Sequence, residues 1–161
     1  MADEWFENET RKHQQEVQRL LILAAKLLLD RAVFHDQSKL EPPEREIFIE
    51  YTPKLREVTY GSEEYKAYLK EMQIALEHHY AKSPHHPEYN IINGLNNPGF
   101  EVDGMNLIDV IEMLCDWIAA TKRHADGSIG KSIDHNQKRF QISDQLTQIL
   151  RQTVGYLNSA K

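Results

Sequence analysis

Histidine is the residue type in this sequence best suited to chemistry, and it occurs eight times among 161 residues. His35 and Asp36 stand next to each other shortly after the apolar run that spans residues 20–29. A buried imidazole and a buried carboxylate each need a partner, and one divalent metal ion can serve both. The pair therefore indicates a metal site at the end of the first helix.

Further histidines and one aspartate occur in positions that could complete such a site. On a helical projection of about 100° per residue, His79 shares a face with the apolar residues of its segment. A single histidine on an apolar face is more often an ordinary core residue, but several near a His-Asp pair would each need a partner. Imidazole and carboxylate together suit Mn, Co, Ni, Fe or Zn. The other candidates are His13, His78, His85, His86 and Asp116.

A polar strip runs along the helix expected over residues 105–124. On the helical projection, Asp109, Glu112, Asp116 and Arg123 fall on one narrow face, whereas the rest of the circumference is apolar. The strip is either a solvated face or a row of carboxylates that point inward. In the second case, a buried Asp116 would need a cation.

The elements that position these residues are all expected to be helices. Apolar residues recur at steps of three and four, and no stretch alternates as a strand does. Breaks are expected at residues 52–53 and 60–62, and residues 82–104 are expected to form a long loop. The prediction is one all-α domain over residues 1–161 with five to six helices, in the segments 3–33, 45–51, 62–80, 105–124 and 142–158.

Composition limits the classes of partner. A net charge of −6 and a pI near 5.7 provide no general attraction to nucleic acid or anionic lipid, so neither a nucleic-acid polymer nor a membrane is expected as a partner. The longest apolar run is too short to cross a bilayer, and the N-terminus lacks the order of a signal peptide. The single cysteine, Cys115, is predicted to be a small core residue in a reducing, cytoplasmic compartment. The last apolar stripe could serve the core or a homodimer.

Three blocks carry a resemblance to a known family. "HDQSKLEPPE", "HHYAKSPHHPEY" and "LIDVIEMLCDW", in this order, resemble the HD-domain superfamily of metal-dependent phosphohydrolases. More narrowly, they resemble a small, largely uncharacterised HD-like family of bacterial and phage proteins. The resemblance covers residues 13–124 and implies a single HD-like helical domain, to which the helix at about 142–158 is added as a packing helix.

The resemblance also implies the metal ligands. It places His13, His35, Asp36 and Asp116 around one divalent transition-metal ion, with Asp36 able to bridge to a second ion. The expected ligands of the second ion are His79 and His86, with His78 and His85 as alternates. One ion and two ions are both compatible with the pattern.

The implied activity is hydrolysis of a small phosphorylated metabolite, with a nucleotide as the expected substrate. Asp36 would be catalytic, since its metal activates a water that attacks phosphorus. Lys39 is expected to be catalytic and to bind substrate, because it matches a lysine that approaches substrate phosphate in several HD subgroups. Glu41 is also expected to be catalytic, as a substitute for a glutamate that assists catalysis near this position in HD 5′-nucleotidases. Further contacts to an anionic substrate are expected from Lys122, Arg123 and His124.

Two other functions stay open at this point. One is a metal-stabilised nucleotide-binding or regulatory module that does not hydrolyse its ligand. The other is a di-iron oxygenase, because some HD proteins use paired iron ions.

Overall fold

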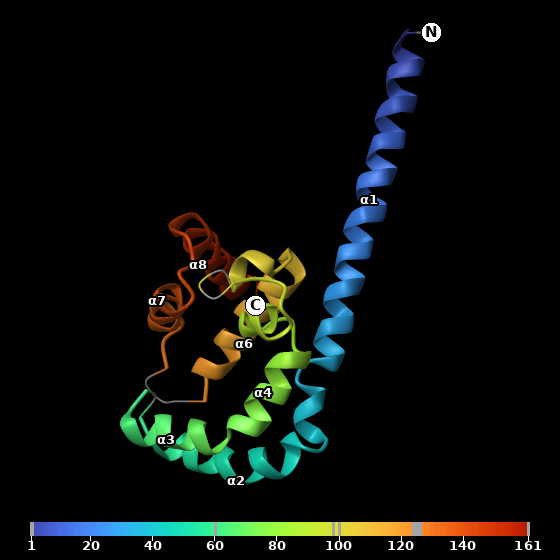
Figure 1. The fold of residues 1–161 in the computed structure, drawn as a ribbon. Coiled ribbons are helices and arrows are strands. Elements are labelled where there is room, and N and C mark those ends of the chain that lie inside the picture. Colours follow the sequence, from blue (N-terminus) through green and yellow to red (C-terminus); the bar gives the residue numbers. More distant parts are fainter. Residues whose placement is uncertain (1, 60, 98, 100, 124–126, 161) are drawn as a thin grey trace. The chain divides into compact units, whose positions relative to one another are not determined.

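The chain is helical throughout the part that the computed structural model describes, which is every residue except 1, 60, 98, 100, 124–126 and 161. These residues form eight α-helices and two short 3-10 helices and no strand, which confirms the all-α prediction. The chain divides into two compact units, residues 1–35 and residues 36–161, and each is described by itself (Figure 1). The prediction of one domain stays a prediction.

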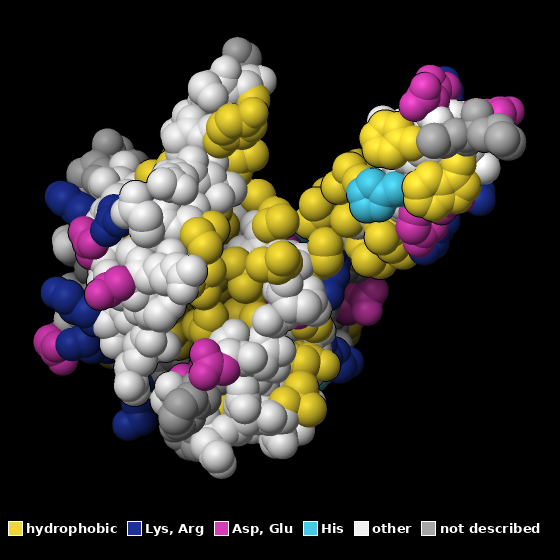
Figure 2. Space-filling view, turned by 90° about the horizontal axis from the view of Figure 1, so that it is seen from above, with side chains coloured by type: hydrophobic (Ala, Val, Ile, Leu, Met, Phe, Trp, Pro, Cys, Tyr) yellow, Lys and Arg dark blue, Asp and Glu magenta, His cyan; other side chains and the backbone are white. Residues whose placement is uncertain are grey.

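The first unit is one long helix. Helix α1 spans Ala2–Phe34, close to the expected segment, and it carries large hydrophobic side chains that are exposed (Figure 2). Among them, Trp5, Phe6 and Leu21 are each about two-thirds exposed. None of the helices that the described residues form has the length and apolar character needed to span a bilayer.

The second unit begins at Asp36, whose φ of 57° lies in the left-handed region. Aspartate tolerates this conformation better than most residues. A 3-10 helix, η1, follows at Gln37–Leu40, and helix α2 spans Glu44–Glu57. The expected break at residues 52–53 is wrong, because α2 continues through Pro53. The proline lacks the N–H that would donate to the helix, so the helix continues there at a local cost.

The segment expected as one helix over residues 62–80 is two helices. Helix α3 spans Glu63–Glu71, where the Ser62 side chain caps the N-terminus, and helix α4 spans Gln73–Lys82. They meet at Met72, which is fully buried and has ψ near 1°. The backbone of Met72 departs from the helical conformation there, although sequence periodicity alone shows no break.

The segment expected as a loop contains local structure. Helix α5 spans Glu88–Ile92, and a 3-10 helix, η2, spans Val102–Gly104. Between them, the Nδ2 atom of Asn90 donates to the Glu101 carbonyl oxygen at 2.7 Å. This buried asparagine ties the two short elements together.

Three helices form the main apolar core of the second unit. They are α6 at Leu107–Thr121, α7 at Ile129–Arg139 and α8 at Asp144–Ser159, and Figure 1 shows α8 at the opposite end of this unit from α2 and α3. Their buried residues form one cluster: Val110, Met113, Leu114, Ile133, Leu150 and Val154.

The expected count of five to six helices is wrong, because the described residues form eight α-helices. The additional helices arise from the division at Met72 and from α5 and α7, which are too short or too polar for a clear apolar period. Cys115 is exposed and not in the core as predicted, because it falls at the four-residue spacing of the exposed residues Leu107 and Ile111 on α6.

Candidate metal centre

Four side chains of the second unit bring possible metal ligands together. One ligand atom from each of them lies within 4.8 Å of all the others, and the four residues are Asp36, His79, His85 and His86. Asp36 directly precedes η1, His79 lies in α4, and the other two histidines lie in the turn between α4 and α5. His79 is 1% exposed and His85 is 3% exposed, so imidazoles here face the protein interior.

The separations within this cluster suit a single ion. His79 Nε2 lies 3.1 Å from His86 Nε2 and 3.2 Å from Asp36 Oδ1, and His85 Nε2 lies 3.5 Å from the same oxygen. Two ligands at about 2.1 Å from an ion lie about 3.4 Å apart in a tetrahedron and about 3.0 Å apart in an octahedron. The donor set of imidazole and carboxylate fits zinc, manganese, iron, cobalt or nickel.

A buried glutamate supports two histidines of α4. Glu44, in the first turn of α2, is fully buried. Its Oε2 atom lies 3.1 Å from His79 Nδ1 and accepts from the Ser38 hydroxyl at 3.0 Å, and its Oε1 atom lies 2.7 Å from His78 Nδ1. The edge of the Phe48 ring packs against His79, with 6.2 Å between ring centroids. These contacts hold the imidazole of His79 from the side opposite Asp36.

A second glutamate supports His85 in the same way. Glu112 lies on α6, is 9% exposed, and its Oε1 atom lies 3.1 Å from His85 Nδ1. The α6 helix is positioned by a capping box, in which the Asn106 side chain accepts from the backbone of Asp109 and Asp109 accepts from Asn106. The polar strip of α6 therefore points inward at Asp109 and Glu112, which are both buried, as one of the two sequence interpretations required.

The surroundings favour an ionised Asp36 and a neutral His86. Burial opposes ionisation of Asp36, but hydrogen bonds from His79 and His85 and the charge of Lys39 outweigh it and hold the pKa of Asp36 well below its usual range. Burial and the positive charges of neighbouring histidines lower the pKa of His86 to about 2. Carboxylate and neutral imidazole are the forms that bind metals.

Two further groups extend the cluster around Asp36. A carboxylate oxygen of Asp116 on α6 lies within 4.8 Å of one of Asp36. Asp36 Oδ2 accepts from Lys39 Nζ at 2.6 Å, and this ammonium also lies 5.1 Å from the centre of the Phe48 ring. Asp36 thus contacts His79, His85 and Lys39 and also lies near the second aspartate.

Other predicted site residues are not part of this cluster or lie outside the residues that the structure describes. The side chain of Glu41 is exposed, and the buried carboxylate in this region is Glu44. Lys122 and Arg123 follow the end of α6 and are exposed. His124 lies outside the described residues. Their predicted substrate contacts stay predictions.

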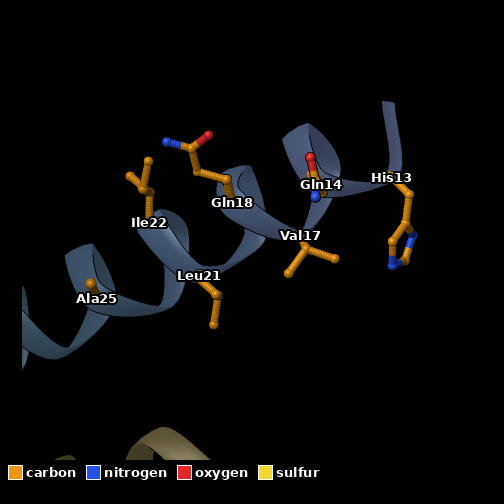
Figure 3. Close-up of a pocket in the computed structure, with 7 residues that line it drawn as sticks. All are labelled: His13, Gln14, Val17, Gln18, Leu21, Ile22 and Ala25. Carbon is orange, nitrogen blue, oxygen red and sulfur yellow. The ribbon is translucent and has the colours of Figure 1, made fainter. Parts of the chain in front are cut away.

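The two remaining predicted ligands belong to the first unit. His35 is its last residue, is half-buried, and precedes Asp36 directly. His13 is exposed on α1, on one side of the helix together with Val17 and Leu21 (Figure 3). The residues labelled in Figure 3 line a hollow on the protein surface. Because all of them come from α1, the hollow is part of the helix surface and not an enclosed cavity. The predictions that His13 and His35 bind metal stay predictions.

Sequence reasoning missed Glu44 and Ser38 as parts of the site. Glu44 follows two prolines at the start of a polar helix, where an acidic residue is expected for helix-dipole reasons alone. Ser38 and Glu44 belong to a short segment without apolar periodicity. The available signal was their proximity in sequence to Asp36.

The fold and the cluster define an all-helical protein with a candidate metal centre built from histidines and carboxylates. The chain belongs to a protein family of unknown function, DUF5662, whose model matches residues 2–156. No curated protein matches the chain, and no solved structure does either.

Proposed function

We propose that the protein is a metal-dependent phosphohydrolase that acts on a small phosphorylated metabolite, with a nucleotide as the expected substrate. The observation that carries the proposal is the convergence of three imidazoles on the carboxylate of Asp36 within 4.8 Å. A divalent ion bound there would lower the pKa of a water molecule and supply a nucleophile near neutral pH.

The residues around Asp36 support an anionic substrate. Lys39 places an ammonium 2.6 Å from Asp36 Oδ2, and its side chain is 26% exposed. A partly exposed cation beside a metal ligand can bind an incoming phosphate oxygen, as a point charge does. The resemblance to HD phosphohydrolases favours the same substrate class.

A second function follows from the number of ligands. Four protein ligands complete a tetrahedral ion, and closed tetrahedral sites are structural more often than catalytic. Such an ion would stabilise a nucleotide-binding or regulatory module without hydrolysis. A six-coordinate ion with the same four ligands would keep two positions for water and substrate, so the identity of the metal separates the two functions.

The test combines metal analysis with an activity assay. Protein purified without chelator is expected to contain manganese, iron, cobalt, nickel or zinc, and to release phosphate from a panel of nucleoside mono-, di- and triphosphates. His79→Gln should lose both properties, whereas His135→Gln, which removes an exposed histidine of α7, should keep them.

Three outcomes are informative. Wild-type protein that neither contains nor binds a transition metal would contradict both proposed functions. Bound metal with nucleotide binding but no phosphate release under any metal would favour the non-catalytic module. Full activity of His79→Gln would exclude this cluster as the site.

A further inference from the structure

Two glutamates from different helices contact the histidines of the candidate metal centre on the side away from Asp36. Glu44 on α2 lies 3.1 Å from His79 Nδ1, and Glu112 on α6 lies 3.1 Å from His85 Nδ1. The two contacts are alike in the atoms that they join, although the glutamates are far apart in sequence. The same carboxylate–imidazole arrangement therefore occurs twice, once for each of the two most deeply buried histidines of the cluster.

The chemistry of the glutamate contacts places a proton on Nδ1 of each histidine. A carboxylate can only accept hydrogen bonds, so the imidazole must donate through Nδ1–H. In a metal-bound imidazole the lone pair is then on Nε2, the atom that lies 3.2 Å from Asp36 Oδ1 in His79 and 3.5 Å in His85, so both groups could bind one ion between them. In the absence of an ion, Nε2 would itself donate to Asp36, and the ring would carry both protons. Without the glutamates, the Asp36 carboxylate would favour the proton on Nε2, the form that cannot bind a metal through that atom.

Burial of the glutamates is a cost that needs an explanation. Glu44 is 0% exposed and Glu112 is 9% exposed, and an ionised carboxylate is costly to bury without hydrogen bonds. Glu44 accepts on both oxygens, and the Ser38 hydroxyl, 3.0 Å from both Glu44 Oε2 and His79 Nδ1, closes a small network around that imidazole. The helix positions of these acids thus serve the orientation of the histidines.

We propose that Glu44 and Glu112 are positioning residues that hold His79 and His85 in the Nδ1–H form and direct both Nε2 atoms toward the metal beside Asp36. This inference rests on the proposed metal centre. Carboxylates that bind metal-ligating histidines in this way orient the ring and make it a better ligand, and their removal typically weakens metal affinity 10- to 100-fold.

The first test measures metal affinity. Glu44→Gln and Glu112→Gln keep nearly the same shape but replace one acceptor oxygen with a donor. Each should weaken Co²⁺ and Zn²⁺ binding by about 10- to 100-fold in competition with a chromophoric chelator. The matched control is Glu46→Gln, which removes an exposed carboxylate two residues further along α2 and should bind as wild type does.

The second test reads the proton directly and needs no activity. Long-range ¹H–¹⁵N spectra of zinc-loaded, ¹⁵N-histidine-labelled protein should show protonated Nδ1 for His79 and His85. Glu44→Gln should change the ring signals of His79 and leave those of His85, and Glu112→Gln should do the reverse. A general loss of structure would move both sets, so this pattern separates positioning from folding.

The possible results test this inference separately from the proposed function. Affinities of both variants within twofold of wild type, or His79 and His85 of zinc-loaded protein protonated on Nε2 and not on Nδ1, would overturn the inference while leaving the metal centre in place. If wild-type protein binds no metal, the proposed function fails, and spectra of metal-free protein at neutral pH still test the Nδ1–H form. If Glu44→Gln does not fold, Glu112→Gln provides the same test from α6.

Discussion

Asp36 combines a backbone role and a side-chain role at one position. Its backbone is left-handed, with a φ of 57°, two residues after the end of α1. Its carboxylate contacts His79, His85 and Lys39. Few residues other than aspartate and asparagine suit both a left-handed backbone and a polar contact. A substitution that tests the carboxylate should therefore keep the backbone preference.

Asp36→Asn should remove bound metal without unfolding the protein. Asparagine accepts the left-handed backbone but lacks the charge that a divalent ion needs from its only carboxylate among the four clustered ligands. Metal content by mass spectrometry should fall from about one ion per chain to near zero. Gln37→Ala, at the exposed neighbouring position, should retain full metal content. Equal metal content in both variants would contradict the assignment.

At the scale of elements, the site depends on where α2, α4 and α6 start and on the segments that connect them. Helix α4 contributes the ligand His79, and α2 and α6 contribute Glu44 and Glu112, which contact histidines of the cluster. The capping of α6 and the packing of the short elements α5 and η2 are local features that sequence changes can test separately from the metal.

Asn106→Ala should destabilise the protein by about 1 kcal/mol, because it removes the side-chain oxygen that accepts from the backbone of Ile108 and Asp109 at the start of α6. Asn106→Ser, which keeps a capping oxygen, should recover most of this loss. Urea unfolding of both variants provides the comparison. Equal stability of the alanine and serine variants would mean that the cap contributes little.

Two glycine substitutions should have opposite effects on stability. At Gly104 in η2, an added Cβ would lie 2.6 Å from Asn90 Cγ, and Asn90 is 2% exposed, so Gly104→Ala should cost about 1–3 kcal/mol. At Gly155 in α8, nothing lies within 4 Å of an added Cβ, so Gly155→Ala should stabilise by about 0.5–1 kcal/mol. Urea unfolding measures both. Stabilisation by Gly104→Ala would contradict the close approach of η2 and α5.

At the scale of the whole molecule, the second unit holds all four clustered ligands between elements that are distant in sequence. Asp36 and His86 are separated by 50 positions along the chain, as their numbers show. An ion that joins them stabilises the folded state, because the unfolded chain cannot present the same four ligands together.

Addition of a bound metal should therefore raise the melting temperature. At a free ion concentration of about 100 times Kd, the gain is about 2.7 kcal/mol, which corresponds to about 5–11 °C for a chain of this size. Differential scanning calorimetry of chelator-treated protein with and without Zn²⁺, Mn²⁺ or Co²⁺ measures the shift. Asp36→Asn should show a much smaller shift, and an equal shift in both proteins would point to binding elsewhere.

Sequence alone determined the helical class, the limits of α1 and the burial of His79, because helical periodicity is a local property that neighbouring residues carry. It also marked the His-Asp and His-His pairs as chemically unusual. It did not reveal the division at Met72 or the helices α5 and α7, where burial and short-range contacts outweigh apolar period.

Only the tertiary structure decided which side chains meet. It brought both His85 and His86 to Asp36, where sequence reasoning had treated one as an alternate of the other. It also placed Glu44 and Glu112 behind His79 and His85, which no spacing along the chain could show. The reason is physical: contacts among α2, α4 and α6 depend on how the helices pack, and packing is set by side chains across the whole unit.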